Sequence, residues 1–394
     1  MFIKEDDLKL NAWQFSQRKY LPWEMKQKLT VTRIKEWYEN WDGDVYVSYS
    51  GGLDSTVLLH LVRRVLGREI PAVFCNTGLE FPEIVRFARK ADGEFVEIVP
   101  RDRAGNRTTY HQVLEKYGYP LISKETGDKI YKLRHGKLSE RYRNYLLNGD
   151  ERGKYGKLAD KWGFLLHAPF EISSKCCEIM KKRPFHVYAK KTGRVPYIGI
   201  TQDEGFRRAN QYAHTGCNVY DGATIKSQPM AFWTRQDVLR YVVEMDLEIC
   251  SVYGDIRQRT DGLYYTTGEQ RTGCMFCPMG IHLEEEPNRF QRLSATHPKC
   301  HVYCMRNTKV IQRATGKSLY PDFMRNQEIE QDLERRLETM DARAFYQEYQ
   351  VIRGLGMAEV MDYVGIPWTT WEAQGQMSLK ELLVAGDEDQ QAAA

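Results

Sequence analysis

The chain has 394 residues, of which 42% are hydrophobic and 28% are charged, and its formal net charge is +4 at pH 7. This composition is typical of a folded globular protein and excludes a disordered chain, and so small a charge does not by itself indicate a nucleic-acid or membrane partner. No apolar run approaches the roughly 20 residues that a membrane span requires. Residues 1–7 also lack the pattern of an export signal, so we expect no membrane partner and a cytoplasmic location.

Strands and helices alternate along the first two thirds of the chain. Residues 1–40 predict an N-terminal helical segment. The following region, 41–240, contains β-prone runs and helical patterns in alternation; the runs are 45–49, 72–75, 95–99 and 195–200, and the helices are 56–62 and 83–91. Such alternation predicts an α/β domain with a doubly wound parallel sheet that helices cover on both faces.

Three further regions depart from this alternation. The stretch 124–161 is a basic insertion, with eleven Lys or Arg residues against six Asp or Glu residues and with Tyr131, Tyr142, Tyr145 and Tyr155 interleaved. Such a segment suits a polyanionic partner, although many soluble insertions share its composition. The segment 241–310 carries two close pairs of cysteines. The remainder, 311–394, is expected to be helical, because charged helix formers with apolar spacing run from 327 to 352.

The turn after the first β-prone run has the composition of a phosphate-binding loop. Its six residues are Ser50, Gly51, Gly52, Leu53, Asp54 and Ser55. The glycines allow the backbone to approach phosphate oxygens, and the amino end of the following helix attracts an anion. The serine hydroxyls can donate hydrogen bonds, and Asp54 can cap the helix or hold Mg²⁺. A plain β-to-α turn would need fewer of these features, so the full string favours phosphate binding.

This string resembles the Ser-Gly-Gly-x-Asp-Ser loop of the N-type ATP pyrophosphatases (PP-loop proteins), which have the adenine nucleotide alpha-hydrolase-like fold. It is distinct from a Walker loop, because no Gly-Lys-Ser/Thr follows. Further segments resemble the phosphoadenylyl-sulfate (PAPS) reductase branch of that group; they are 76–83, Ser123-Lys124, 199–208 and 229–238.

The resemblance implies a set of site residues. Catalytic roles fall to Ser50, Asp54, Ser55 and Arg207. ATP with Mg²⁺ would be bound by Ser48, Ser50, Gly51, Gly52, Asp54, Ser55, Thr77, Gly78, Lys124 and Arg208.

The nine cysteines predict a metal site rather than disulfides, since a reducing compartment is expected. Cys75, Cys217 and Cys250 stand alone and are interpreted as small buried hydrophobic residues. Two close pairs are candidate metal ligands: Cys176 with Cys177, and Cys274 with Cys277. Four thiolates permit zinc or an iron–sulfur cluster, and spacing alone does not decide between them. Cys300 and Cys304 are interpreted as core residues, with a ligand pair or a persulfide relay as alternatives.

The pattern of a Cys-Cys pair, a long gap and a Cys-x-x-Cys pair resembles the [4Fe-4S] adenylyl-sulfate reductases. It is also similar to the sulfur-inserting enzyme of DNA phosphorothioation. The resemblance implies a [4Fe-4S] cluster on Cys176, Cys177, Cys274 and Cys277. The gap is long for this pattern, which predicts an insertion near 250–268.

The position of the last cysteine distinguishes between two candidate reactions, sulfonucleotide reduction and sulfur transfer. Reductases of this family carry a nucleophilic cysteine near the C-terminus, and this sequence has no cysteine after Cys304. We therefore expect an ATP-dependent sulfurtransferase that adenylates an acceptor, releases pyrophosphate and inserts sulfur. Expected partners are a sulfur donor such as a cysteine desulfurase and an acceptor such as DNA or RNA, with a homodimer as one candidate assembly. An adenylyl-sulfate or phosphoadenylyl-sulfate reductase and a nucleotide-binding redox sensor are the alternatives.

Overall fold

The computed structural model describes residues 12–153, 155–204, 212, 215–222, 224–305, 308–321, 324, 326–353 and 356–368. Contacts divide the chain into two compact units. The first unit comprises Met1–Lys116 and Lys175–Cys274, and the second comprises Tyr117–Ser174 and Met275–Ala394. Each unit therefore combines two separated parts of the chain, whereas the expected boundaries near 40, 240 and 310 followed the chain in sequence.

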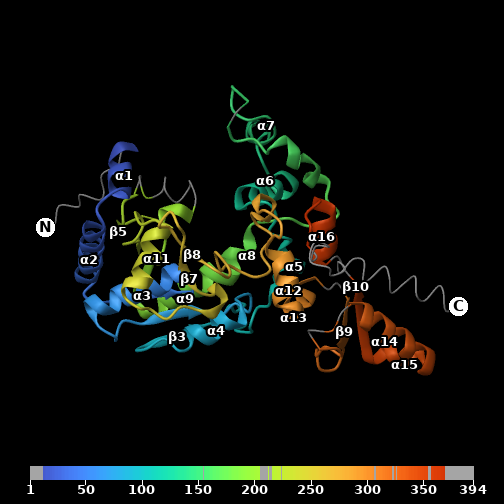
Figure 1. The fold of residues 1–394 in the computed structure, drawn as a ribbon. Coiled ribbons are helices and arrows are strands. Elements are labelled where there is room, and N and C mark those ends of the chain that lie inside the picture. Colours follow the sequence, from blue (N-terminus) through green and yellow to red (C-terminus); the bar gives the residue numbers. More distant parts are fainter. Residues whose placement is uncertain are drawn as a thin grey trace. The chain divides into compact units, whose positions relative to one another are not determined.

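The first unit is built on a six-stranded sheet with the order β3-β2-β1-β4-β6-β5. Figure 1 labels the two outermost strands of this sheet, β3 and β5. Its strands are β1 Val45–Tyr49, β2 Ala72–Cys75, β3 Phe95–Ile98, β4 Val195–Ile198, β5 Asn218–Val219 and β6 Lys226–Ser227. All neighbours pair in parallel except β5 with β6. The predicted α/β fold with a parallel sheet is confirmed, and the first four strands begin at the predicted residues.

Helices connect these strands in two directions. The chain passes from β1 through α3 (Leu53–Leu66) to β2, and through α4 (Pro82–Ala88) to β3. It later returns through α9 (Arg183–Thr192) to β4, on the opposite side of β1. Right-handed crossovers that run in opposite directions place helices on both faces of the sheet. Accordingly, α3 contacts β1 and α9 contacts β3.

The strand order reverses between β1 and β4, and this position matters for function. In open parallel sheets, ligands bind beyond the carboxyl ends of the strands at such a switch point. Tyr49 is in register with Phe74 on β2, and Ser48 is in register with Ile198 on β4. The segments that follow these three strands therefore begin at one edge of the sheet.

The remaining elements of the first unit are short apart from two helices. They are α1 Ala12–Lys19, α2 Trp23–Asn40, α5 Tyr110–Tyr117, α8 Lys175–Cys177, the π-helix Glu178–Lys182, the 3-10 helices Gln202–Glu204 and Ser251–Tyr253, α11 Arg235–Glu244, β7 Ile256–Gln258 and β8 Tyr264–Thr266. Strands β7 and β8 form an antiparallel hairpin within the predicted insertion at 250–268. Thr234 and Asp237 close a capping box at the start of α11, within the family-like segment 229–238.

The predicted basic insertion lies in the second unit and is helical. Ser123 caps α6 (Lys124–His135), and Ser139 caps α7 (Glu140–Asn148), each by accepting a backbone N–H bond. Other elements of this unit are the 3-10 helices Asp160–His167 and Ile281–Leu283, α12 Arg289–Thr296, α13 Pro298–Met305 and α16 Met357–Val364.

A pair of antiparallel strands corrects the expectation for residues 327–352. Helices α14 (Asn326–Thr339) and α15 (Ala342–Glu348) form there, but the residues from Tyr349 pair as β10 (Tyr349–Arg353) with β9 (Thr308–Gln312). Val310 of β9 packs with Ile329, Leu333 and Phe345 of the two helices into one buried cluster. The backbone N–H and C=O groups of the Tyr-Gln-Val-Ile run are paired with a partner strand that lies far away in the sequence. Among the described residues, none of the helices combines the length and the apolar character that crossing a bilayer demands.

Candidate functional site

The predicted phosphate loop is held by hydrogen bonds among its own residues. The hydroxyl oxygens of Ser50 and Ser55 are 2.9 Å apart, and the Ser50 N–H donates to Ser55 Oγ at 3.2 Å. The Ser55 hydroxyl donates to the Gly52 carbonyl at 2.9 Å, and the Gly52 N–H donates to Ser50 Oγ at 3.3 Å. The loop is therefore fixed in shape by local contacts, which is the preorganisation that an anion site needs.

The two glycines of the loop have different roles. Gly51 has φ +70°, and a Cβ there would lie 3.1 Å from Ile84 Cγ2. Gly52 is the N-cap residue of α3, whose first intrahelical bond runs from the Thr56 N–H to the Gly52 carbonyl. The amides at this helix end precede that bond, so they donate outside the helix backbone, as the Leu53 N–H does to the Tyr253 hydroxyl at 3.2 Å.

Residues outside the predicted motif surround the loop. The guanidinium of Arg235 lies 3.8 Å from the Asp54 carboxylate and donates to the Gln270 carbonyl at 2.8 Å. Burial lowers the pKa of Arg235, and the nearby Asp54 and Tyr253 raise it. Arginine remains charged through such shifts. The loop is thus next to a partly buried cation, as a site for phosphates requires.

Gly199 begins the family-like segment 199–208, and the structure gives it a specific position. A Cβ on Gly199 would lie 3.0 Å from the Asp54 carbonyl oxygen and 3.1 Å from Ser55 Cα. Only glycine allows the segment after β4 to approach the loop so closely. This contact ties the two strands at the switch point to the phosphate loop.

The segment after β2 forms its own turn. Thr77 donates from its N–H to Glu80 Oε2 at 3.0 Å and from its hydroxyl to the same carboxylate. The Gly78 N–H donates to Asn76 Oδ1 at 3.1 Å, and Gly78 has φ +77°. Asn76 in turn donates to Glu97 at 2.8 Å. Thr77 and Gly78 are therefore held in a rigid turn at the edge where the phosphate loop begins.

The remaining predicted nucleotide residues are placed as follows. Ser48 is half-buried on β1. Lys124 belongs to the second unit, where it opens α6. Arg207 and Arg208 lie outside the described residues.

In the first unit, two of the four predicted cluster cysteines converge on one lysine. The pKa of Lys181 is raised far above its ordinary value by Cys274, which is also its hydrogen-bond partner, and further by Glu80 and Cys177. Lys181 Nζ lies 3.9 Å from the Glu80 carboxylate. Cys176 is buried, and the chain turns from α8 into the π-helix directly after Cys177. Such π-turns often occur at functional positions.

The second unit contains the fourth predicted ligand and the remaining cysteine pair. Arg289 donates to the Cys277 carbonyl at 3.1 Å, and Phe276 packs on Tyr303 of α13 with ring centres 5.9 Å apart. The pKa of Cys304 is raised well above its ordinary value by burial and by the nearby Cys277 and Cys300. Cys304 is a core residue, as predicted, whereas Cys300 is only half-buried.

Thiols are suitable donors for an iron–sulfur cluster or zinc, but the structure does not assemble them into a formed site. Across the parts of the chain that it describes, no three His, Cys, Asp or Glu side chains are grouped as metal ligands would be. The cysteines outside the two pairs behave as predicted, because Cys75, Cys217 and Cys250 are all buried. Burial raises the pKa of Cys75 to about 12 and also raises that of Cys250.

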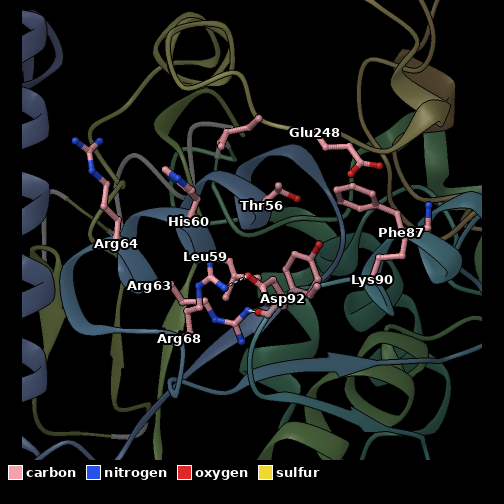
Figure 2. Close-up of a pocket in the computed structure, with 13 residues that line it drawn as sticks. Thr56, Leu59, His60, Arg63, Arg64, Arg68, Phe87, Lys90, Asp92 and Glu248 are labelled. Carbon is pink, nitrogen blue, oxygen red and sulfur yellow. Dashed lines mark hydrogen bonds and ion pairs between the residues drawn. The ribbon is translucent and has the colours of Figure 1, made fainter.

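A pocket of about 340 Å³ lies in the first unit and includes Tyr49 and Thr56 beside the phosphate loop. Figure 2 shows Arg63 and Arg68 of its wall directed toward Asp92. Arg68 pairs with that carboxylate at 2.7 Å, and Arg63 donates to the carbonyls of Ile70 and Asp92. Arg63 and Arg68 are therefore bound by groups of the protein itself.

A comparison with protein-family models agrees with the resemblance to PAPS reductases. The family model described as phosphoadenosine phosphosulfate reductase domain matches residues 44–135 and 135–279. A phosphoadenosine 5'-phosphosulfate reductase of Vibrio atlanticus is 38% identical over 64 residues, which are 16% of this chain and 24% of that protein. The matched family residues include the phosphate loop and both predicted cysteine pairs.

Other similar proteins match different lengths. An uncharacterized protein of Methanocaldococcus jannaschii is 24% identical over 248 residues, which are 62% of this chain and 38% of that protein. A subunit of the glutamine-hydrolyzing GMP synthase of Thermococcus kodakarensis is 34% identical over 94 residues, 24% of this chain and 28% of that protein. The chain thus spans well under half the length of the curated relatives it matches. A solved phosphoadenylyl-sulfate reductase of Candida auris matches with a TM-score of 0.33 and 13% identity, covering 62% of this chain and 92% of that one.

Proposed function

Because this chain belongs to the phosphoadenosine phosphosulfate reductase domain family, we propose that it is an ATP-dependent sulfurtransferase of that family. An acceptor oxygen attacks the α-phosphorus of ATP, and the bond to the β-phosphate oxygen breaks, so that pyrophosphate leaves. Hydrosulfide then attacks the activated acceptor atom and AMP departs, with the sulfur's proton passing to solvent. A persulfide from a cysteine desulfurase would deliver the same sulfur if a thiol reductant then cleaves the S–S bond.

The observation that carries this proposal is the preorganised loop at the strand-order switch. Ser50 and Ser55 hold each other at 2.9 Å at the amino end of α3, where a pyrophosphate group would meet hydroxyls and backbone N–H groups together. Charge that develops on the leaving pyrophosphate is stabilised most by donors that are already in place. Asp54 is the proposed Mg²⁺ ligand, and Arg235 lies close enough to share the charge of the phosphates. Arg207 and Arg208 remain proposed phosphate contacts.

A reductase is the second candidate, since family members carry that name, but three of the thiols outside the proposed cluster are poorly suited to its chemistry. Reduction requires a thiolate that can attack the sulfonucleotide. Cys75, Cys250 and Cys304 are buried with raised pKa values, so they favour the unreactive thiol form. We therefore predict that reduced thioredoxin releases no sulfite from adenylyl sulfate or phosphoadenylyl sulfate. Rapid sulfite formation that is lost in Cys300→Ser or Cys304→Ser would establish the reductase instead.

We also propose a [4Fe-4S] cluster on Cys176, Cys177, Cys274 and Cys277. The donor set is chemically suited to it, and the convergence of Cys177 and Cys274 on Lys181 supports the part of the set that lies in the first unit. When bound, such a cluster would supply a redox-active iron–sulfur centre. The chain itself contributes the hydrogen bond between Lys181 and Cys274. The positive charge of this lysine would offset part of the negative charge of the thiolate ligands.

For the acceptor, we propose nucleic acid, bound at least in part by the basic helices α6 and α7. The rings of Tyr142 and Tyr145 are stacked, with centres 6.3 Å apart and planes 17° apart, and both are more than one third exposed. Tyr155 is 61% exposed. Exposed aromatic rings among lysines and arginines are the composition of a single-strand binding surface. Several of the lysines pair with nearby acids, as Lys132 does with Asp128 at 2.7 Å, so the aromatic rings carry this proposal.

One experiment tests the central proposal. The protein is purified anaerobically and assayed for pyrophosphate release from ATP with DNA, RNA and small metabolites as acceptors, with and without sulfide. Release that depends on one acceptor class, with AMP as the second product, supports the sulfurtransferase. Saturable ATP binding, with no pyrophosphate released from ATP in the presence of any of these acceptors, would instead support the redox-sensing alternative.

A further inference from the structure

An arm of the first unit brings two hydroxyl groups to the phosphate loop. This arm, residues 251–272, contains the 3-10 helix Ser251–Tyr253 and the β7–β8 hairpin and ends at Thr272. It is fastened to α11, because Gln236 exchanges two hydrogen bonds with the backbone of Tyr264 at 2.8 and 2.9 Å. The arm therefore holds its hydroxyl groups in a fixed position.

The Tyr253 hydroxyl joins the helix end to Thr272. Its oxygen accepts the N–H of Leu53, the first residue of α3, at 3.2 Å and also hydrogen-bonds Thr272 Oγ1. Tyr253 is only 2% exposed, and these are its two hydrogen-bond partners among the described residues. A buried hydroxyl proton needs an acceptor, so Tyr253 donates its proton to Thr272.

This arrangement leaves the proton of Thr272 available. Thr272 is half-buried, and within the described residues its hydroxyl has Tyr253 as its hydrogen-bond partner. A Cβ placed on Gly52 would lie 3.2 Å from Thr272 Oγ1 and 3.2 Å from Ser50 Oγ. The hydroxyls of Ser50 and Thr272 therefore flank the same glycine of the phosphate loop. Each hydrogen bond in such a chain polarises the next, which strengthens the final donor.

We propose that Thr272 is a phosphate-binding residue of this loop: its hydroxyl donates to an oxygen of the ATP pyrophosphate group, and Tyr253 is the residue that positions it. The inference rests on the proposed function, since it assigns a further ligand to the same nucleotide. It also assigns a role to the arm, because Thr272 lies in the arm and outside the loop motif, which ends at Ser55. The anion recognised is a polyphosphate, and inorganic pyrophosphate is the simplest probe.

The test compares isosteric variants by calorimetry with inorganic pyrophosphate and with ATP, each with Mg²⁺. Thr272→Val removes the hydroxyl and should raise the Kd for both ligands at least about 10-fold, as expected for a bond to a charged group. Thr272→Ser keeps the hydroxyl and should stay within about 2-fold of the unchanged protein. Tyr253→Phe should raise the Kd by roughly 2- to 10-fold, because the Thr272 hydroxyl loses its orientation. Thr260→Val, in the exposed turn of the same hairpin, is the matched control and should change nothing.

Each result decides the question. Thr272→Val with an unchanged Kd, while Asp54→Ala abolishes binding, would overturn this inference and leave the proposed function standing. Equal losses in Thr272→Ser and Thr272→Val would show that the side chain only packs, which also overturns it. An unchanged protein that binds neither pyrophosphate nor ATP would contradict the proposed function itself. Melting temperatures of all variants are measured so that a folding defect is recognised, and Thr272→Ser then provides the comparison.

Discussion

In the phosphate loop, the bonds that fix Ser50 and Ser55 join residues within one short turn. The group of proposed ligands Cys176, Cys177, Cys274 and Cys277 is built differently, because Lys181 stands in the same helical stretch as Cys177 but has Cys274, from a distant segment of the chain, as its hydrogen-bond partner. A loop of the first kind forms most of its hydrogen bonds within its own few residues. A site of the second kind depends on the packing of every segment that supplies a ligand. Substitutions should therefore act locally in one region and through assembly in the other.

The largest effect is expected in the loop. Asp54→Ala and Ser50→Ala should each reduce pyrophosphate release by at least about 100-fold, because each removes a preorganised group that stabilises the leaving pyrophosphate. Iron content and circular dichroism should stay unchanged, since the loop's bonds are local. Asp261→Ala, in an exposed turn, is the control. Unchanged release in both loop variants would show that the loop is only a structural turn.

The cysteine group should respond in the opposite way. Cys177→Ser or Cys277→Ser should remove most of the iron, about four atoms per chain in the unchanged protein, and bleach its brown colour. Calorimetric binding of ATP should persist, because the loop does not use these thiols. Cys217→Ala, at a buried core position, should retain iron. Colourless protein with one zinc per chain would contradict the cluster.

These two regions also differ in how far the sequence predicts them. The loop is recognisable because all of its groups stand within six residues between a strand and a helix, and strands β1 and β2 occur at the predicted residues. Arg235, Tyr253 and Thr272 were not predicted, because their proximity to the loop arises from tertiary packing of α11 and the arm. For Thr272, one clue was present: it stands two residues before Cys274. The pairing of β9 with β10 was missed because long-range pairing outweighs local helix propensity.

A smaller effect is expected at the proposed acceptor surface. Tyr142→Ala with Tyr145→Ala should weaken single-stranded DNA or RNA binding by about 1–3 kcal/mol for each stacked base that is lost, and leave pyrophosphate binding unchanged. Fluorescence anisotropy with labelled oligonucleotides measures this. Tyr265→Phe, an exposed tyrosine in the first unit, is the control. Binding that is insensitive to both changes would remove α7 from the acceptor site.

The smallest effect tests how local the loop is. Gly199→Ala places a methyl group 3.0 Å from the Asp54 carbonyl oxygen, so the loop must shift by a few tenths of an ångström. We expect pyrophosphate affinity to fall a few-fold and stability by about 1 kcal/mol. Gly163→Ala has no atom within 4 Å of the added methyl group and is the control. A Gly199→Ala variant with unchanged affinity would show that the loop is independent of β4.

The position of β1 at the centre of its sheet has a consequence for synthesis of the chain. One edge of β1 pairs with β2, which follows shortly, but the other pairs with β4, at Val195–Ile198. A growing chain therefore exposes an unpaired, apolar strand edge while the whole of Tyr117–Ser174 is being translated. Such edges are templates for aggregation. Fragments that end near residue 116 should accumulate in inclusion bodies, and a chaperone that covers this edge during translation should increase the yield of folded protein.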